Sequence, residues 1–285
     1  METVADGLTI GLVLLAALMH ASWNALTKAS GDPLVTITII TATGGLCALP
    51  LILGLPLPGP EVWPWLALSA VIHYVYQLSL IRTYQLGDLS QVYPIARGLA
   101  PLGVACLAAV GSDEILEAGQ VVGLALASGA IVSLGTARAP GVSTRRAVAM
   151  AVLTASLIGS YTYSDGRGVR AAGHPAVYIG WSFFLGCVPL VTTTTWLRWN
   201  EGLASVRRVG VHAFGGGLMA TLGYAIALWA MSRAPMASIA SLRESSVLFA
   251  AFLGSRMLGE SFGRRRMASA FVLVVGLVLV QIRWN

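Results

Sequence analysis

Three charged residues, Arg97, Arg243 and Glu244, stand inside long apolar segments of the sequence. A guanidinium group can hold a carboxylate or a phosphate through two parallel hydrogen bonds, and a carboxylate can bind an amine or carry a proton. An ionisable group within a membrane costs from about 3 to more than about 10 kcal/mol, so it persists where water, a partner or a ligand compensates. These three residues are therefore the first candidates for a binding site.

Each of these charges also has a structural interpretation. Tyr93 lies one helical turn before Arg97, and flanking prolines remove backbone donors there, so the arginine could instead bond freed helix carbonyls. Arg243 and Glu244 are sequence neighbours, which point about 100° apart on a helix and pair poorly with each other. One hypothesis pairs Glu244 with Arg97 and leaves Arg243 for a ligand. The other treats the charges as an ion pair that holds the two halves of the chain together.

Two further pairs of polar residues are spaced by four positions, His20 with Asn24 and His73 with Gln77. This spacing places each pair on one helical face. Histidine titrates near neutral pH, which suits proton coupling, whereas a buried histidine bonded to a helix carbonyl is the structural alternative.

Asp165 lies one helical turn after Tyr161, about 27 Å along its apolar segment, which predicts a place near the membrane interface. We interpret Asp165 as a candidate proton carrier, and its alternative is an ordinary helix-end residue beside Arg167 and Arg170. The candidate substrate-binding residues are Arg97, Arg243, Glu244, Tyr93, Asn24, His73, Gln77 and Tyr161, and the candidate proton carriers are Asp165, His20 and Glu244.

The elements that must position these residues are unusually poor in charge. Of the 285 residues, 56% are hydrophobic and 11% are charged, whereas a soluble domain has about 25% charged residues. So little charge cannot cover a water-facing surface, which excludes a soluble enzyme, a disordered chain and a nucleic-acid binder. The three cysteines lie in apolar stretches without metal-ligand spacing, and we expect neither a metal nor a cofactor.

Ten apolar segments approach the length of roughly 20 residues that a helix needs to cross a bilayer. They cover 8–27, 33–54, 63–81, 89–110, 119–136, 147–165, 176–196, 211–231, 236–258 and 267–282. Twelve of the 18 Lys and Arg residues lie in or beside the odd-numbered connections between these segments. By the positive-inside rule these connections are cytoplasmic, so we expect a multi-pass protein of the plasma (inner) membrane with both termini facing outward.

The two halves of the sequence resemble each other. An offset of 146 places Arg97 on Arg243 and Glu114 on Glu260, and residues 31–35 resemble residues 173–177. We therefore predict two repeats, 1–140 and 141–285, with five helices each. An odd number of helices inverts the second repeat relative to the first, an architecture typical of secondary transporters with a site at the repeat interface.

Four motifs carry a resemblance to a known family, namely His20–Lys28, Tyr93–Gly98, Tyr161–Gly166 and Ser241–Glu244. With two five-helix halves, and a short acidic loop before the last helix of each, they resemble the EamA-like branch of the drug/metabolite transporter superfamily. The resemblance covers essentially the whole chain. It implies an all-α bundle around a central cavity, no ATPase activity and a small polar metabolite as cargo.

We expect a secondary active transporter that is an exporter coupled to protons, or an exchanger. Two buried arginines against one glutamate favour a cargo with an anionic group, such as an amino acid or an organic acid. A channel or scaffold and an intramembrane enzyme are the alternatives, although no nucleophile or metal motif of such an enzyme occurs. The expected partners are the cargo, the lipid bilayer and protons, with the chain a monomer or a homodimer.

Overall fold

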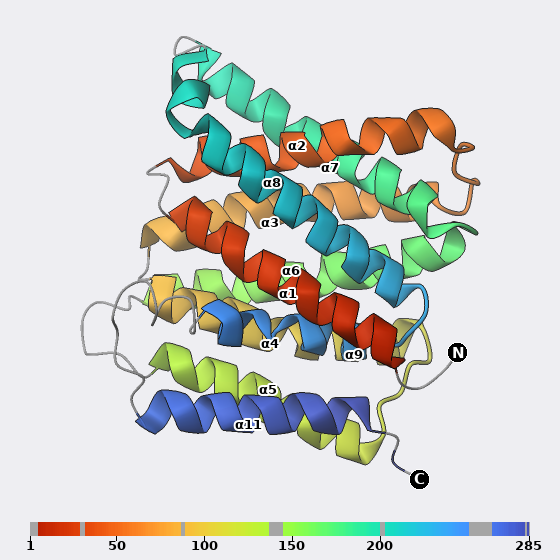
Figure 1. Ribbon diagram of the computed structural model, residues 1–285, viewed down its shortest axis with the longest axis vertical. Coiled ribbons are helices and arrows are strands. Elements are labelled where there is room, and N and C mark those ends of the chain that lie inside the picture. The colour runs from red at the N-terminus through yellow and green to blue at the C-terminus, as the bar shows by residue number, and fades with distance from the viewer. Residues whose placement is uncertain are drawn as a thin grey trace.

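The computed structural model describes residues 5–28, 32–86, 89–136, 145–199, 203–250, 264–282 and 284. Within these ranges the regular secondary structure is helical (Figure 1). The labelled helices are α1 (Gly7–Lys28), α2 (Pro33–Gly54), α3 (Trp63–Leu86), α4 (Leu89–Gly111), α5 (Ala118–Thr136), α6 (Arg145–Ala171), α7 (Pro175–Leu197), α8 (Leu203–Met231), α9 (Met236–Arg243) and α11 (Arg264–Gln281).

Seven helices in the described part of the chain are long and apolar enough to cross a membrane. Two shorter apolar stretches, Ala118–Ser133 and Met267–Gln281, lie in α5 and α11. The surface agrees with a bilayer as solvent, because large apolar side chains such as Val110 (89% exposed) and Phe271 (70% exposed) point outward. The chain is therefore a multi-pass membrane protein.

Two of the helices begin at similar local motifs. Asp32 precedes Pro33 and its side chain accepts the N–H of Val35 at 3.2 Å, which caps α2. His174 precedes Pro175 and accepts the N–H of Ala176 at 3.3 Å, which caps α7. A capping side chain satisfies an orphan backbone donor, and a proline at the first helical position has no donor to satisfy.

The predicted ninth segment, 236–258, is wrong as one continuous helix. α9 ends at Arg243, Glu244 and Ser245 form a turn, and helix resumes at residue 246. The N–H of Glu244 bonds the carbonyl three residues earlier, that of Ser241, at 2.9 Å. Hydropathy predicts that a segment is apolar. It does not detect a local change in which a backbone N–H bonds the carbonyl three residues earlier instead of the one four residues earlier. Residues 251–258 of this segment lie outside the described residues.

The helices form a bundle in which neighbours in space are often distant in sequence (Figure 1). α2 packs against α7 at one side of the bundle and α5 packs against α11 at the other, with α1, α3, α4, α6 and α8 between them. α1 packs on α8, α3 packs on α6, and α4 packs on both α5 and α6. α1 begins and α11 ends at the same end of the bundle (Figure 1).

Close approach of α5 and α11 depends on two glycines. A Cβ on Gly276 would lie 2.6 Å from the carbonyl oxygen of Gly123 and 2.6 Å from the backbone nitrogen of Ala127. Small residues of this kind let membrane helices bring their backbones together, where dispersion contacts hold them. α5 and α11 are thereby fixed as one pair at the edge of the bundle.

Candidate functional site

A cavity of about 150 Å³ lies inside the bundle, between α1, α2, α3, α6, α7, α8 and α9. Much of its wall is apolar or aromatic, with Phe183 and Tyr76 among the lining residues. Its ionisable or hydrogen-bonding side chains include His20, His73, Gln77, Tyr161, Tyr224 and Arg243. An apolar pocket with a few convergent polar groups is the usual form of a small-molecule site.

Arg243 is the one Arg, Lys, Asp or Glu among the described residues that line this cavity. It is the last residue of α9, it is 8% exposed, and its guanidinium carbon lies 4.9 Å from the centre of the Tyr224 ring. A guanidinium over an aromatic face is attracted by the ring's negative face, and the contact leaves its planar N–H donors available for an anion. The helix break at Glu244 ends α9 directly after this residue.

Arg97 has a different partner. Its Nη2 lies 2.9 Å from Oε1 of Glu244, and both side chains are 4% exposed. Neither residue is part of the cavity wall. The observed pairing of Glu244 with Arg97 agrees with both hypotheses, a pair that leaves Arg243 for a ligand and an ion pair that holds the two halves together. Arg243 is the residue of the three that lies on the cavity wall.

Asp165 is fully buried and accepts three hydroxyl groups. Ser69 and Tyr178 donate to its Oδ1, Tyr178 at 2.7 Å, and Tyr224 donates to its Oδ2 at 2.5 Å. Nε2 of His73 lies 3.9 Å from the same Oδ2. These donors come from α3, α7 and α8, so the carboxylate of α6 is held by three other helices. Tyr224 and His73 also line the cavity, which makes this cluster its direct neighbour.

The alternative interpretation of Asp165 as an ordinary helix-end residue needs correction. α6 continues six residues past Asp165 to Ala171, so the residue lies inside the helix rather than at its end. Arg167 and Arg170 have other partners: Arg167 donates to the carbonyl of Gly111 at the end of α4, and Arg170 donates to the carbonyl of Met231 at the end of α8. The apolar window ended at 165 because Asp, Arg and Gly lower the local hydropathy, although the helix itself continues.

The histidine pairs are arranged differently from each other. His20 lines the cavity and accepts the indole N–H of Trp23 at 3.3 Å, whereas Asn24 donates to the carbonyl of His20 at 2.8 Å and is absent from the wall. His73 and Gln77 both line the cavity. Gln77 is 6% exposed, and its Oε1 has no hydrogen-bond partner among the described residues.

Tyr161 joins the predicted residues around the cavity. The ring of Tyr161 stacks on that of His73, with centroids 4.1 Å apart and an interplanar angle of 29°. Nδ1 of His73 also lies 3.1 Å from the carbonyl oxygen of Ser69, the contact that its structural interpretation requires. Tyr93 belongs to α4, and its side chain lies outside the described residues.

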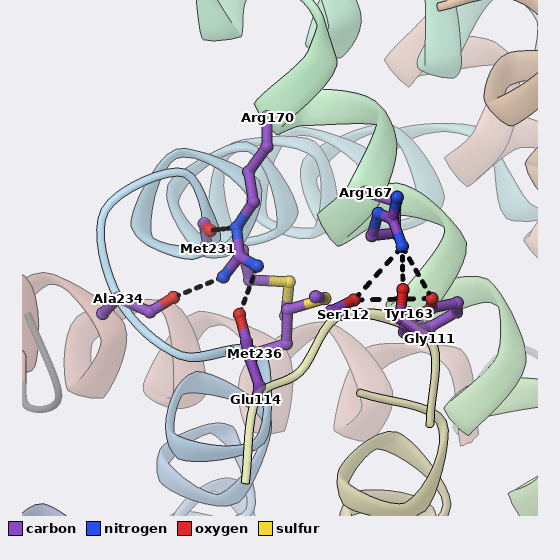
Figure 2. A network of polar contacts seen from close by, with 9 residues as sticks. All are labelled: Gly111, Ser112, Glu114, Tyr163, Arg167, Arg170, Met231, Ala234 and Met236. Atoms are coloured by element: carbon purple, nitrogen blue, oxygen red, sulfur yellow. Dashed lines mark hydrogen bonds and ion pairs between the residues drawn. The ribbon is translucent and has the colours of Figure 1, made fainter. Parts of the chain in front are cut away.

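A second polar network lies at the end of the bundle where α6 and α8 end (Figure 2). Glu114, in the connection after α4, pairs with Arg170 and accepts the backbone N–H of Met236 at 2.9 Å. Arg170 also donates to the carbonyls of Met231 at 2.8 Å and Ala234 at 2.9 Å. Glu114 therefore satisfies a backbone donor at the start of α9 and places a negative charge at its positive end.

Arg167 forms the other contacts of this network, beside those of Arg170 (Figure 2). It donates to the carbonyl of Gly111 and, at 3.1 Å, to the hydroxyl of Tyr163. The connection after α4 is thus bonded to α6 at two points, through Arg167 and through Arg170. The loop after α4 therefore holds α6 and α9 together.

Sequence reasoning did not find Ser69, Tyr178, Tyr224 or the Glu114 network. Tyr224 follows Gly223, whose missing side chain brings α8 close to α1: a Cβ there would lie 3.2 Å from the carbonyl oxygen of Ala16. A polar aromatic residue next to a glycine in an apolar helix was the available signal. For Ser69 and Tyr178 we see no sequence signal, because each meets Asp165 through packing of a different helix.

Comparison with known proteins indicates which family the second half of the chain resembles. Residues 145–282 match the model of the EamA-like transporter family, which is part of the drug/metabolite transporter superfamily. No curated protein matches the chain. A crystal structure with 18% sequence identity superposes with a TM-score of 0.72, over 95% of this chain and 98% of its own, which shows a shared fold. The α6–α11 part of this multi-pass membrane protein, residues 145–282, is therefore similar to the EamA-like transporter family.

Proposed function

We propose that this protein is a secondary active transporter that binds a small polar metabolite with an anionic group in the central cavity. The observation that carries the proposal is the position of Arg243, a buried guanidinium on the wall of a cavity of about 150 Å³ in an EamA domain. A carboxylate bound there would replace water as the partner of the cation, with two parallel hydrogen bonds. An amino acid or an organic acid has such a group.

Gln77 indicates what else the cargo carries. Its Oε1 is buried on the cavity wall without a hydrogen-bond partner among the described residues, and an unmet buried acceptor is costly. A cargo ammonium or hydroxyl group would satisfy it. The rings of Tyr76, Tyr161 and Phe183 offer apolar contact to the rest of the molecule. These groups together favour a carboxylate that also bears a hydrogen-bond donor.

The proposed architecture is two inverted five-helix repeats, 1–140 and 141–285. If α1 to α4 correspond to α6 to α9, and α5 to α11, most of the observed packing pairs have a counterpart. Under this correspondence the contact of α1 with α8 is equivalent to the contact of α6 with α3, and the contact of α2 with α8 is equivalent to that of α7 with α3. The contact of α2 with α7 is equivalent to itself. This exchange supports a twofold axis between the halves, and the interrupted α9 beside the cavity resembles the broken helices of transporter sites.

Coupling to protons is part of the same proposal, with Asp165, His20 and Glu244 as candidate carriers. Asp165 is favoured because it is buried, it neighbours the cavity through Tyr224 and His73, and its ionisation would change the charge beside the cargo. Glu244 faces Arg97, and His20 accepts from Trp23, so both have partners that restrict them. The proposed location is the plasma membrane, with alternating access and export as the direction.

The test compares two arginines that each stack on an aromatic ring. Arg243 lies over Tyr224 inside the cavity, and Arg233 lies 4.6 Å from the ring centre of Trp229 on the exposed surface. We expect a mixture of L-amino acids, lactate and malate to raise the melting temperature of wild type and Arg233→Lys, because ligands that bind the folded state stabilise it. Arg243→Lys should lose most of the shift, because an ammonium cannot imitate a bidentate guanidinium.

The same variants in proteoliposomes separate the function classes. Saturable uptake of the active compound in wild type and Arg233→Lys, and a loss of about ten-fold or more in Arg243→Lys, is the result expected of a transporter with its cargo on Arg243. Equal melting shifts in all three proteins would remove Arg243 from the cargo site. Non-saturable flux would favour a channel, and chemical turnover of the compound in detergent would favour an enzyme.

A further inference from the structure

Tyr224 contacts both charged groups that the proposed transport cycle requires. Its hydroxyl donates to Oδ2 of Asp165 at 2.5 Å, and its ring lies under the guanidinium of Arg243, 4.9 Å from ring centre to Cζ. The ring also packs against His73, with centroids 5.9 Å apart, and Phe183, with centroids 6.2 Å apart. One rigid side chain on α8 thus joins the buried acid of α6 to the cavity-facing cation of α9.

The two oxygens of Asp165 are not equivalent. Oδ1 accepts from both Ser69 and Tyr178, whereas Oδ2 accepts from Tyr224. A carboxylate oxygen has two lone-pair directions, so Oδ1 is filled and Oδ2 keeps room for a proton. A proton on the open lone pair of Oδ2 would leave the Tyr224 hydroxyl bonded to a neutral carboxyl oxygen, which is a weaker acceptor than a carboxylate. A proton on the lone pair that now accepts from Tyr224 would make Oδ2 a donor, and the phenol would then rotate its hydrogen away and accept instead, or move.

We propose that Tyr224 couples the protonation of Asp165 to the position of Arg243, and so to the affinity of the site for its cargo. This inference rests on the proposed function. Tyr224 acts here as a positioning residue: protonation changes the hydrogen bond at one end of the side chain, and the cation–π contact transmits the change at the other. A ligand or proton shifts an equilibrium through such differential contacts between two states.

Other titratable or charged groups surround this path and must be separated from it. His73 of α3 faces Oδ2 at 3.9 Å, and Tyr178 of α7 bonds Oδ1. Tyr161 of α6 stacks on His73. Arg97 of α4 is paired with Glu244, and His20 of α1 lines the cavity with Arg243. His73 is the competing group, because it is a second ionisable side chain beside Oδ2 of Asp165.

The experiment follows the side chain of Arg243 directly, without cargo. The NMR signal of its Nε–H group, assigned by its absence in Arg243→Lys, is recorded in the purified full-length protein from about pH 5.5 to about pH 8.5. The signal of Arg233 in the same molecule is the internal control. Tyr224→Phe keeps the ring and removes the bond to Asp165. Tyr178→Phe is the matched variant, because it removes a bond to Asp165 that does not lead to Arg243.

In wild type and in Tyr178→Phe we expect the Arg243 signal to titrate, and in Tyr224→Phe we expect it to lose most of its pH dependence. His73→Gln should keep the titration. Retention of the wild-type titration in Tyr224→Phe would overturn the inference. So would an Arg243 signal that does not titrate in wild type, or a titration that disappears in His73→Gln.

The NMR titration of Arg243 can fail or succeed independently of the melting-temperature test of cargo binding. If the mixture of L-amino acids, lactate and malate stabilises wild type and Arg243→Lys equally, the proposed function fails although the titration is unaffected. If it stabilises wild type alone but the titration survives in Tyr224→Phe, the inference fails and the cargo site stands. Where both hold, the stabilisation by the mixture should depend on pH in wild type and become independent of pH in Tyr224→Phe.

Discussion

Arg97 and Arg243 are both buried, but they have different surroundings. Arg97 lies 2.9 Å from Glu244, whereas Arg243 lies over the ring of Tyr224 and faces the cavity. Removing one partner of a buried ion pair strands the other charge, which costs more than removing both. Arg97 and Glu244 should therefore behave as a unit in stability, and Arg243 should be sensitive mainly in binding.

We expect Arg97→Met to destabilise the protein by roughly 3 to 5 kcal/mol, because Glu244 is left ionised and buried. The double variant Arg97→Met with Glu244→Gln should recover most of that loss. Thermal unfolding in detergent measures both. If Arg97→Met melts like wild type and the double variant gains nothing over it, the pair does not hold α4 to the end of α9.

Part of the candidate site could be predicted from residue types and spacing. Arg243, His73, Gln77 and Tyr161 were singled out as polar groups within apolar helices, and the structure places all four on the cavity wall. Their functional roles stay predictions. The donors to Asp165 could not be predicted, because Ser69 and Tyr178 stand on helices whose relative rotation is set by packing rather than by local sequence.

At the level of elements, the start of α9 depends on residues far away in sequence. Glu114 accepts the N–H of Met236 and pairs with Arg170, which itself bonds the carbonyls between α8 and α9 (Figure 2). α9 is eight residues long, too short to be stable by itself in isolation. Its position, and with it that of Arg243, is therefore held by the loop after α4.

We expect Glu114→Ala to loosen α9, because it removes the acceptor for Met236 and leaves Arg170 without its carboxylate. The cost should be roughly 1 to 3 kcal/mol, with faster amide exchange across Met236–Arg243 by hydrogen–deuterium exchange. Asp113→Asn is the control: Asp113 is exposed and has a positive φ of 54°, a conformation that asparagine also tolerates. Equal exchange in all three proteins would mean that the loop does not position α9.

The contact of α5 with α11 gives a second prediction at this scale. Gly276→Ala should lower the melting temperature, because a Cβ would lie 2.6 Å from backbone atoms of α5 that cannot rotate away. Gly129→Ala is the matched control within α5, since nothing lies within 4 Å of its added Cβ. It should melt like wild type or slightly higher, because alanine favours the helix. A Gly276→Ala variant as stable as Gly129→Ala would contradict the packing.

The helices themselves were largely predictable, and the exceptions have one cause. Apolar length predicted α2 at 33–54, and the structure begins and ends the helix at the same residues. It failed where polar residues are buried inside the bundle: α6 continues past Asp165, and α9 stops at Arg243. Hydropathy treats a polar residue as facing water, so it misjudges a helix at the places where polar side chains face a cavity.

On the scale of the whole molecule, charge is distributed unevenly between the two ends of the bundle. α1 begins and α11 ends at one end, and the opposite end carries the exposed Arg82 near the end of α3, the exposed Arg145 and Arg146 at the start of α6, and Arg198 after α7 (Figure 1). The first end has Arg167 and Arg170, which are engaged in the network around Glu114, and the exposed Arg233 between α8 and α9. Basic residues near helix ends are retained on the cytoplasmic side.

We therefore expect the C-terminus to face outward. Alkaline phosphatase is active outside the inner membrane and a green fluorescent protein is fluorescent inside, so each is fused after Asn285 in a bacterial host. Phosphatase activity without fluorescence is the expected result, because a basic end that stays cytoplasmic sends the end of α11 to the other side. Fluorescence without phosphatase activity would place the Glu114 network on the cytoplasmic side. The proposed orientation of the protein in the membrane would then be wrong.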